Sequence, residues 1–278
     1  MNYTPRAPAA GLSPFVESFF HLSDYSPEHS FERIVPDGSS NLVIELDNQT
    51  RSLVDNESLE PRASFRGAWL SGPHDEYFSI RSVADGELAA VRFHPAGMYA
   101  LVKSSMEDLS NRVQAAETLL GESIQGLREE ILRAKDAETK LDAIEEWLSV
   151  HVDPDGKPPR EIESALDSMR GDPTISTVQT VIDESGLSRK HFTQVFKKYV
   201  GVTPKRFQRI LRFSQALTQI QSNEKIHWSA LSVDCGYSDQ AHFIKDFQRF
   251  SGFNPSEFLA VNSDRLNFFP IDSEDPED

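Results

Sequence analysis

The pattern of hydrophobic and polar positions changes along the chain near Met98. Before that residue, apolar side chains alternate with polar ones in Phe78–Arg81, and 42–46 and 88–93 are further apolar segments of strand length. Glycines at turn-like intervals separate these segments, which is typical of short strands joined by tight turns. Residues 31 to about 95 are therefore predicted to form strands.

From Met98 onward, apolar residues recur at the spacing of helices. One helical face covers 119–132, with Gly121 as the place where that helix can break, and another covers 141–148. The segment 152–159 contains three prolines and a glycine, a composition typical of a linker. A chain of 278 residues is long enough for two domains with separate cores. We therefore expect an α+β module with trailing helices over residues 1–155 and an all-α domain over 159–262.

A short helix, a glycine turn and a second helix occur twice in the last hundred residues. In the first copy, 175–182 forms an apolar helical stripe, Gly186 can end that helix, and Ser188 can cap the next one. In the second copy, Gly236 and Ser238 stand at the same offsets. Each second helix is expected to bury phenylalanines, namely Phe192, Phe196, Phe243, Phe247 and Phe250. The outward residues are Arg189, Lys190, Thr193, Gln194 and Lys197 in the first copy, and Gln240, His242, Lys245 and Arg249 in the second.

A helix-turn-helix with a basic and amide-rich outward face has the geometry that enters a major groove. Residues 204–220, between the two copies, are predicted to form one helix roughly 25 Å long. Such a rod can hold two reading helices near the roughly 34 Å separation of successive major-groove faces. The pattern therefore predicts a double helix-turn-helix reader of double-stranded DNA.

The formal net charge of −16 is distributed unevenly along the chain. No acidic residue occurs between Glu184 and Glu224, whereas this window holds eight arginines and lysines. Phosphates are attracted by local basic surface, so the charge of the whole chain does not exclude a nucleic acid. The alternative is an ordinary solvated basic face. Residues 263–278 are acidic and are predicted to form a disordered tail.

Three runs in this region, Phe196–Pro204, Gly236–Phe243 and Phe247–Pro255, resemble the signature of the AraC family of bacterial transcription regulators. The resemblance covers about 159–262, a little over a third of the chain. It implies a seven-helix domain whose third and sixth helices lie in adjacent major grooves. It also implies that the protein is a sequence-specific transcription regulator.

The resemblance can be carried over to individual positions of this chain. It implies contacts to bases or phosphates from Arg189, Lys190, Thr193, Gln194, Asp239, Gln240, Ala241, His242 and Lys245. Among the outward residues, Gln194, Gln240 and Lys245 are predicted to read base edges, and Lys197, Lys198 and Arg249 to hold phosphate. The sequence departs from the family at Ile182, where a small residue is usual, and at Lys245, where arginine is common. These departures and the apolar Ala241 affect the expected target sequence rather than DNA binding itself.

Residues 31–97 resemble, more weakly, the cupin-like small-barrel modules of some members of that family. The likeness lies in Arg33–Gly38 followed by Asn41–Ile44, and in Val91–Gly97. It leads to the hypothesis that a small-molecule effector binds this module at a site lined by Trp69, Arg92 and His94. The alternative places Trp69 in the core and Arg92 on the surface. A second hypothesis is that the N-terminal half is only a protein-interaction module, which dimerises through helices in 110–150. A third is that the chain is an enzyme with a DNA-binding appendage.

Catalysis, cofactors and metals have no support in the sequence, because it contains no nucleophile triad, phosphate-binding glycine loop, dinucleotide fingerprint or metal-ligand spacing. The acidic pair Asp75-Glu76 is interpreted as solvated surface, and Cys235 as a buried structural thiol. The sequence has one cysteine, no apolar run long enough to span a bilayer and a poor signal peptide at its N-terminus. Together these features favour a cytoplasmic protein with no membrane partner. The expected partners are double-stranded DNA, RNA polymerase, an effector and, in the dimerisation hypothesis, a second copy of the chain.

Overall fold

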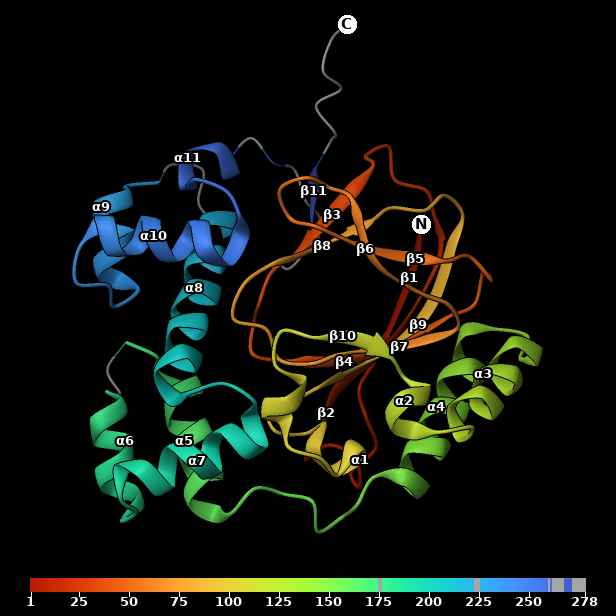
Figure 1. Cartoon of the computed structure of the whole chain (residues 1–278), viewed down its shortest axis with the longest axis horizontal. Helices are drawn as coiled ribbons and strands as arrows, with labels where there is room; N and C mark the ends of the chain where they lie inside the picture. Colours follow the sequence, from red (N-terminus) through yellow and green to blue (C-terminus); the bar gives the residue numbers. More distant parts are fainter. Residues whose placement is uncertain (175–176, 223–225, 260, 262–267, 272–278) are drawn as a thin grey trace, which may run out of the picture.

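The computed structural model describes residues 1–174, 177–222, 226–259, 261 and 268–271. A strand-rich N-terminal domain lies beside a helical C-terminal domain, and the long helix α8 (Pro204–Ser222) connects the two ends of the helical domain (Figure 1). The expected order, a β-rich domain followed by a helix-turn-helix domain, is thus observed. In the described part of the chain, no helix is both long enough and apolar enough to cross a membrane.

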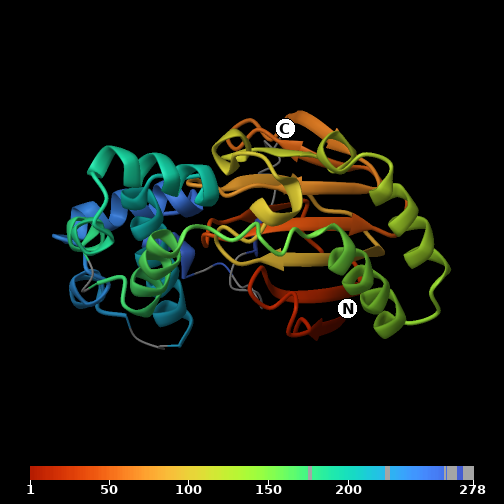
Figure 2. The same ribbon diagram turned by 90° about the horizontal axis from the view of Figure 1, so that it is seen from below.

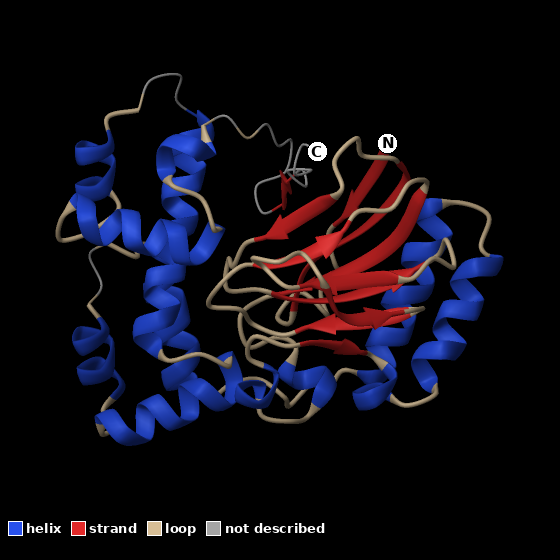
Figure 3. Cartoon of the chain, turned by 45° about the horizontal axis from the view of Figure 1, so that its top comes forward, coloured by secondary structure: helices blue, strands red, loops and turns tan. Residues whose placement is uncertain are grey.

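Two antiparallel sheets form the N-terminal domain. The described residues place six strands in the larger sheet: β1 (Asn2–Arg6), β2 (Val16–Tyr25), β9 (Gly86–Phe93), β4 (Ser40–Glu45), β7 (Ala68–Ser71) and β10 (Val113–Ala115), in that spatial order. They place five strands in the smaller sheet: β11 (Phe268–Ile271), β3 (Phe31–Ile34), β8 (Phe78–Arg81), β5 (Arg51–Val54) and β6 (Pro61–Phe65). Loops from both sheets reach towards the helical domain (Figure 3).

The three predicted strand segments, 42–46, Phe78–Arg81 and 88–93, are confirmed as β4, β8 and β9. Strand β2 lies before residue 31, where the predicted strand region began, and was missed. Its register against β9 shifts between Val16 and Ser18 and again between Leu22 and Tyr25. Such bulges interrupt the two-residue period that makes a strand visible in a sequence.

The helices within 117–151 cover the larger sheet on the side away from the C-terminal domain (Figure 2). After α1 (Tyr99–Val102) and the 3-10 helix η1 (Met106–Leu109) come α2 (Glu117–Leu120), α3 (Ser123–Arg133) and α4 (Ala137–His151). The predicted break at Gly121 is confirmed, since α2 ends there with a φ of 64°. Ile124, Leu127 and Leu148 of these helices belong to the same buried cluster as Leu42 and Ile44 of β4, and this cluster is the main core of the domain.

The helical domain begins after the segment 152–159. Its helices are α5 (Arg160–Gly171), α6 (Val178–Ser185), α7 (Arg189–Val200), α8, α9 (Trp228–Asp234), α10 (Gln240–Ser251) and α11 (Pro255–Phe258). The first glycine turn forms as predicted, with Gly186 at a φ of 69° and the Ser188 hydroxyl accepting a hydrogen bond from the backbone of His191. In the second unit the turn is at Gly236, but Asp239, not Ser238, caps α10.

Phenylalanines form the centre of the helical core. The ring centroid of Phe213 on α8 lies 5.3 Å from that of Phe247 and 5.2 Å from that of Phe250, both on α10. The predicted burial of Cys235 is confirmed at 0% exposure. The same burial raises the pKa of the Cys235 thiol to about 11, which fits a structural role.

The prediction of a disordered tail from residue 263 is wrong for Phe268–Ile271. These residues form β11, which pairs antiparallel with β3 in the N-terminal domain. The rest of the predicted tail, 263–267 and 272–278, lies outside the described residues. Pairing between two strands so far apart in the chain leaves no pattern in the local sequence. The acidic composition of the segment was therefore the only signal, and it indicated disorder.

Candidate nucleic-acid interface

Helix α7 presents its polar face near its N-terminal end. Arg189, Lys190 and Gln194 are exposed, and Thr193 is half-buried. The opposite face of the helix is turned to the core, where Phe192 and Phe196 have no exposed surface. The side chain of Arg189 also donates a hydrogen bond to Gln179 of α6. The structure therefore brings these four predicted DNA-contacting residues together on one accessible surface.

Helix α10 presents Gln240, Ala241 and Lys245 as exposed residues in the same manner. His242 is half-buried, with its ring edge-on to Tyr237 at a centroid separation of 5.4 Å. The Asp239 Oδ1 atom accepts a hydrogen bond from the His242 backbone at 2.8 Å, and this bond holds the pKa of Asp239 below its usual range. Asp239 therefore starts the reading helix, and its contact with DNA stays a prediction.

Helix α8 holds α7 and α10, which are the two helices predicted to read DNA and are called the reading helices below. At about 1.5 Å per residue, its 19 residues give a rod about 28 Å long. Arg209 of α8 donates to Asp246 of α10 at 2.8 Å, and Arg212 donates to the Pro173 carbonyl at 3.0 Å. Two of the cations in the basic window thus fasten the domain together, which their spacing in the sequence could not reveal.

The C-terminal ends of both reading helices face the N-terminal domain. Lys197 forms an ion pair with Glu107 of η1, and the Lys198 ammonium lies 5.4 Å from the ring centroid of Tyr99 on α1. The Arg249 guanidinium lies 3.5 Å from the Asp75 carboxylate. These are the three residues predicted to hold phosphate. In this arrangement they contact the protein's other domain, so phosphate binding by them stays a prediction that competes with these contacts.

The loop 72–77 contacts both helix-turn-helix units. A Cβ atom on Gly201, which ends α7 at a φ of 85°, would lie 2.3 Å from Pro73 Cγ. A Cβ atom on Gly252, which ends α10 at a φ of 73°, would lie 2.5 Å from Tyr77 Cζ. Neither position could hold a larger residue without moving the loop. The loop therefore touches both units at the point where each reading helix stops.

Asp75 is the central charged residue of this loop, and its interpretation as solvated surface is wrong. It is 1% exposed and pairs with both Arg206 and Arg249. Asn111 holds it in place, donating to Oδ1 at 2.6 Å and accepting from the Asp75 backbone at 2.9 Å. Its neighbour Glu76 is exposed, as expected. Nothing in the local sequence distinguishes the buried acid from the exposed one.

A cavity of about 510 Å³ lies in the N-terminal domain between residues of the two sheets. Two of the predicted effector contacts, Trp69 and Arg92, line it. His94 follows the end of β9 and is not among the lining residues. Arg92 forms ion pairs with Asp37 at 2.7 Å and with Glu17 at 3.1 Å. Its charge is therefore already balanced within the protein.

Glu45 is a cavity residue that sequence reasoning did not single out. It has no exposed surface, its Oε1 accepts from Trp69 Nε1 at 2.8 Å, and its Oε2 lies 2.7 Å from Arg51. Burial outweighs the neighbouring arginine and raises the pKa of Glu45 to about 7. In the sequence it stands as an ordinary polar residue at a strand end.

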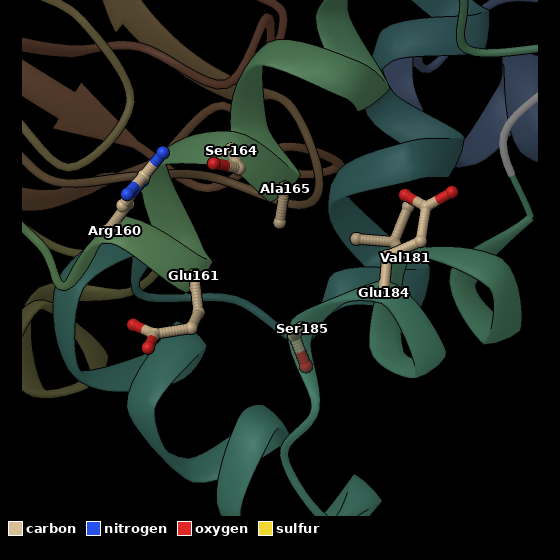
Figure 4. A pocket seen from close by; sticks show the side chains of 7 residues that line it. All are labelled: Arg160, Glu161, Ser164, Ala165, Val181, Glu184 and Ser185. Carbon is tan, nitrogen blue, oxygen red and sulfur yellow. The ribbon is translucent and has the colours of Figure 1, made fainter.

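A smaller hollow of about 200 Å³ lies between α5 and α6 (Figure 4). The side chains of Glu161 and Glu184 line it together with Arg160. Two carboxylates repel phosphate more than one guanidinium attracts it. This surface of the first unit is therefore a poor candidate for contact with DNA.

Two family models match the chain. Residues 181–260 match a helix-turn-helix domain, and residues 5–115 match a domain of unknown function (DUF6597). The transcriptional activator RhaR of Escherichia coli K12 is 27% identical over 116 residues, which are 40% of this chain and 41% of RhaR. An uncharacterized HTH-type regulator of Haemophilus influenzae is 27% identical over 82 residues, 29% of this chain and 27% of that protein. The chain thus matches less than half the length of these curated relatives.

Two solved structures are also similar. ToxT from Vibrio cholerae aligns over 94% of this chain and 98% of its own, with a TM-score of 0.46 and 12% identity. A regulator with an AraC-type DNA-binding domain from Chromobacterium violaceum aligns over 36% of this chain and 89% of its own, with a TM-score of 0.33 and 23% identity.

The two helix-turn-helix units on α8 define a DNA-binding domain. Its exposed arginine, lysine and glutamine residues lie on the two helices that this architecture uses for reading. With the matches to the helix-turn-helix model and to RhaR, the C-terminal part of the chain is similar to the DNA-binding domains of AraC-family transcription regulators.

Proposed function

We propose that the protein is a sequence-specific transcription regulator that binds double-stranded DNA through α7 and α10. The observation that carries this proposal is the pair of accessible polar helix faces, one at each end of a rod about 28 Å long. That spacing suits two successive major-groove faces on one side of a duplex. Bound there, the protein recruits RNA polymerase to a promoter or excludes it. In this proposal α5 to α11 correspond to the seven-helix domain that the family resemblance implies.

Base reading is assigned to the exposed amides and one lysine. A glutamine side chain can make two hydrogen bonds to an adenine edge, so Gln194 and Gln240 are the readers of the first and second units. Lys245 favours guanine but binds it through a single ammonium group. Arg189 and Lys190, at the N-terminal end of α7, supply contacts to bases or phosphates. Lys197, Lys198 and Arg249 supply phosphate contacts once the N-terminal domain releases them.

Selection of duplexes from random DNA by the full chain tests this proposal. We expect enrichment of two short half-sites about one helical turn apart, each read by one unit. The matched control is Gln248→Ala, which removes an exposed amide of α10 that lies outside the assigned readers and should leave the selected sequence unchanged. Failure of the full chain to enrich any sequence at low salt would contradict the proposal.

We further propose that the two-sheet domain is a cupin-like small barrel that holds a small-molecule effector. The cavity supports this, because about 510 Å³ lies within the size range of ligand sites. Val43 and Trp69 supply apolar surface, while Glu45 and Arg92 supply polar groups. The alternative, in which this domain serves only for dimerisation through 110–150, stays a prediction.

A thermal-shift screen of a metabolite library against the wild type and Val43→Phe tests the effector. Val43 lines the cavity, so a phenylalanine there fills part of its volume. An effector of this site should raise the Tm of the wild type but not that of the variant. Compounds that stabilise both proteins bind elsewhere. A library without any selective compound would count against an effector.

A further inference from the structure

Strand β11 connects the end of the DNA-binding domain to the sheet of the other domain. The chain leaves the second helix-turn-helix unit after α11, and Phe268–Ile271 then pair antiparallel with Ile34–Phe31 of β3 (Figures 1 and 3). This pairing covers the β3 edge, whose backbone groups would otherwise lack strand partners on that side. A segment that follows the DNA-reading helices is therefore part of the effector domain.

Two adjacent residues of β11 face different parts of the molecule. Phe268 lines the effector cavity. Phe269 is 1% exposed, and its ring centroid lies 4.7 Å from that of Phe258 on α11. Phe258 in turn packs edge-on against Phe247 of α10 at 5.2 Å. Successive side chains of a strand point to opposite sides, so a shift of the strand moves both rings at once.

Strand β3, the partner of β11, contacts the same helix-turn-helix unit. Arg33 Nη1 donates a hydrogen bond to the Gly252 carbonyl at 3.0 Å. The Arg33 guanidinium also lies 4.3 Å from the ring centroid of Phe253 and 4.9 Å from that of Tyr77. The β3–β11 pair therefore holds the C-terminal end of α10 and the following α11. The first unit is held by different residues, Glu107 and Pro73.

We propose that β11 is an intramolecular strap that transmits the occupancy of the cavity to the second helix-turn-helix unit. An apolar molecule in the cavity displaces Phe268 and with it the strand, which separates Phe269 from Phe258 and loosens the hold on α10 and α11. The regulation thus acts on one of the two DNA readers. This inference rests on the proposed function, because it assumes that the cavity is the effector site.

Hydrogen–deuterium exchange of the full chain, with and without 8-anilinonaphthalene-1-sulfonate as an apolar probe of the cavity, tests the strap. Saturating probe should speed exchange in α10 and α11 by about threefold or more, while α7 should change less. Val43→Phe, which fills the cavity, should abolish both the probe fluorescence and this response. The probe could fluoresce with the wild type and not with Val43→Phe, while exchange in α10 and α11 stays the same with and without it. That result would overturn the strap but leave the cavity as an effector site. No probe fluorescence in the full chain would overturn the strap together with the cavity.

A matched pair of truncations separates the strap from the acidic end of the chain. A chain ending at Ile271 keeps β11, whereas one ending at Val261 lacks it; the segment between them carries one acid and one base, Asp264 and Arg265, and so no net charge. We expect the first to behave like the full chain. The second should exchange faster in α11 without the probe and should not respond to it. Identical exchange in the two truncations would overturn the strap.

Two conservative substitutions guard against a truncation that does not fold. Phe269→Leu should speed exchange in α11 without the probe, because it weakens the contact with Phe258. Phe268→Leu should leave that exchange unchanged and reduce the response to the probe. Wild-type exchange in both variants, with and without the probe, would contradict the proposal. DNA selection plays no part in these outcomes, so a failure of DNA binding remains distinguishable from a failure of the strap.

Discussion

The Asp75 carboxylate lies 3.5 Å from the guanidinium of Arg249, which belongs to the second reading helix. The same carboxylate pairs with Arg206 of α8. A carboxylate and a phosphate offer an arginine the same kind of charged, hydrogen-bonding partner. Asp75 therefore occupies two cations of the DNA-binding domain that a DNA backbone would otherwise attract.

Asp75→Asn should strengthen DNA binding. The substitution removes the charge that holds Arg206 and Arg249, so both become available to phosphate, and we expect affinity to rise by about three- to tenfold at low salt. Fluorescence anisotropy with a selected duplex measures the change. Glu76→Gln is the matched control, since it alters net charge equally at an exposed position. Equal affinities for the two variants would show that the Asp75 contacts do not restrain DNA binding.

Base readers and phosphate contacts should respond differently to alanine. Gln240→Ala should relax sequence preference in one half-site at a cost of about 1–3 kcal/mol against the preferred base. Lys190→Ala should instead weaken binding to all sequences and reduce the salt slope by about one. Affinities for a panel of single-base variants at several salt concentrations distinguish the two effects. Uniform weakening by Gln240→Ala would refute its assignment as a reader.

The stability of the N-terminal domain should depend on the protonation of Glu45. Its pKa is about 7 in the folded protein against an ordinary value of 4.5, so the folded state holds a proton that the unfolded chain releases. Protonation of Glu45 therefore makes its full contribution to the free energy of unfolding below pH 4.5. That contribution, on the order of 3 kcal/mol, is lost as pH rises to 7. Glu45→Gln cannot titrate at this position and should lack this pH dependence. As pH rises from 4.5 to 7, the free energy of unfolding measured in urea should therefore fall less for the variant than for the wild type. Parallel pH profiles for the two proteins would rule out a raised pKa.

The phenylalanine core should be sensitive to a single truncation. Phe213 has no exposed surface and contacts Phe247 and Phe250, so Phe213→Ala should cost about 3–5 kcal/mol in the helical domain. Urea unfolding followed by far-ultraviolet circular dichroism measures this loss. Leu259→Ala, at a position 53% exposed, should change stability by less than about 0.5 kcal/mol. Similar losses for the two variants would contradict the assignment of Phe213 to the core.

Short-range patterns in the sequence account for most of what could be predicted. Gly186 and Ser188 lie between two apolar helical stripes, and their φ angle and cap depend on a few neighbouring residues. The second unit shows the limit of this reasoning, because two adjacent residues, Ser238 and Asp239, were both able to cap α10. The carboxylate took that role, and the helix begins one residue later than the offsets indicated.

The sequence by itself determined that this protein carries two helix-turn-helix units, which helix of each unit presents the polar face predicted to read DNA, and where three of the strands lie. These features depend on residues a few positions apart, whose periodicity reflects one buried face of a helix or strand. Tertiary structure alone decided that Asp75 is buried while Glu76 is exposed. It also decided that Arg209 pairs with the buried Asp246, and that β11 pairs with a strand of the other domain. Each of these depends on contacts between segments distant in the chain. Such contacts are selected by the packing of the whole fold, and no local periodicity records them.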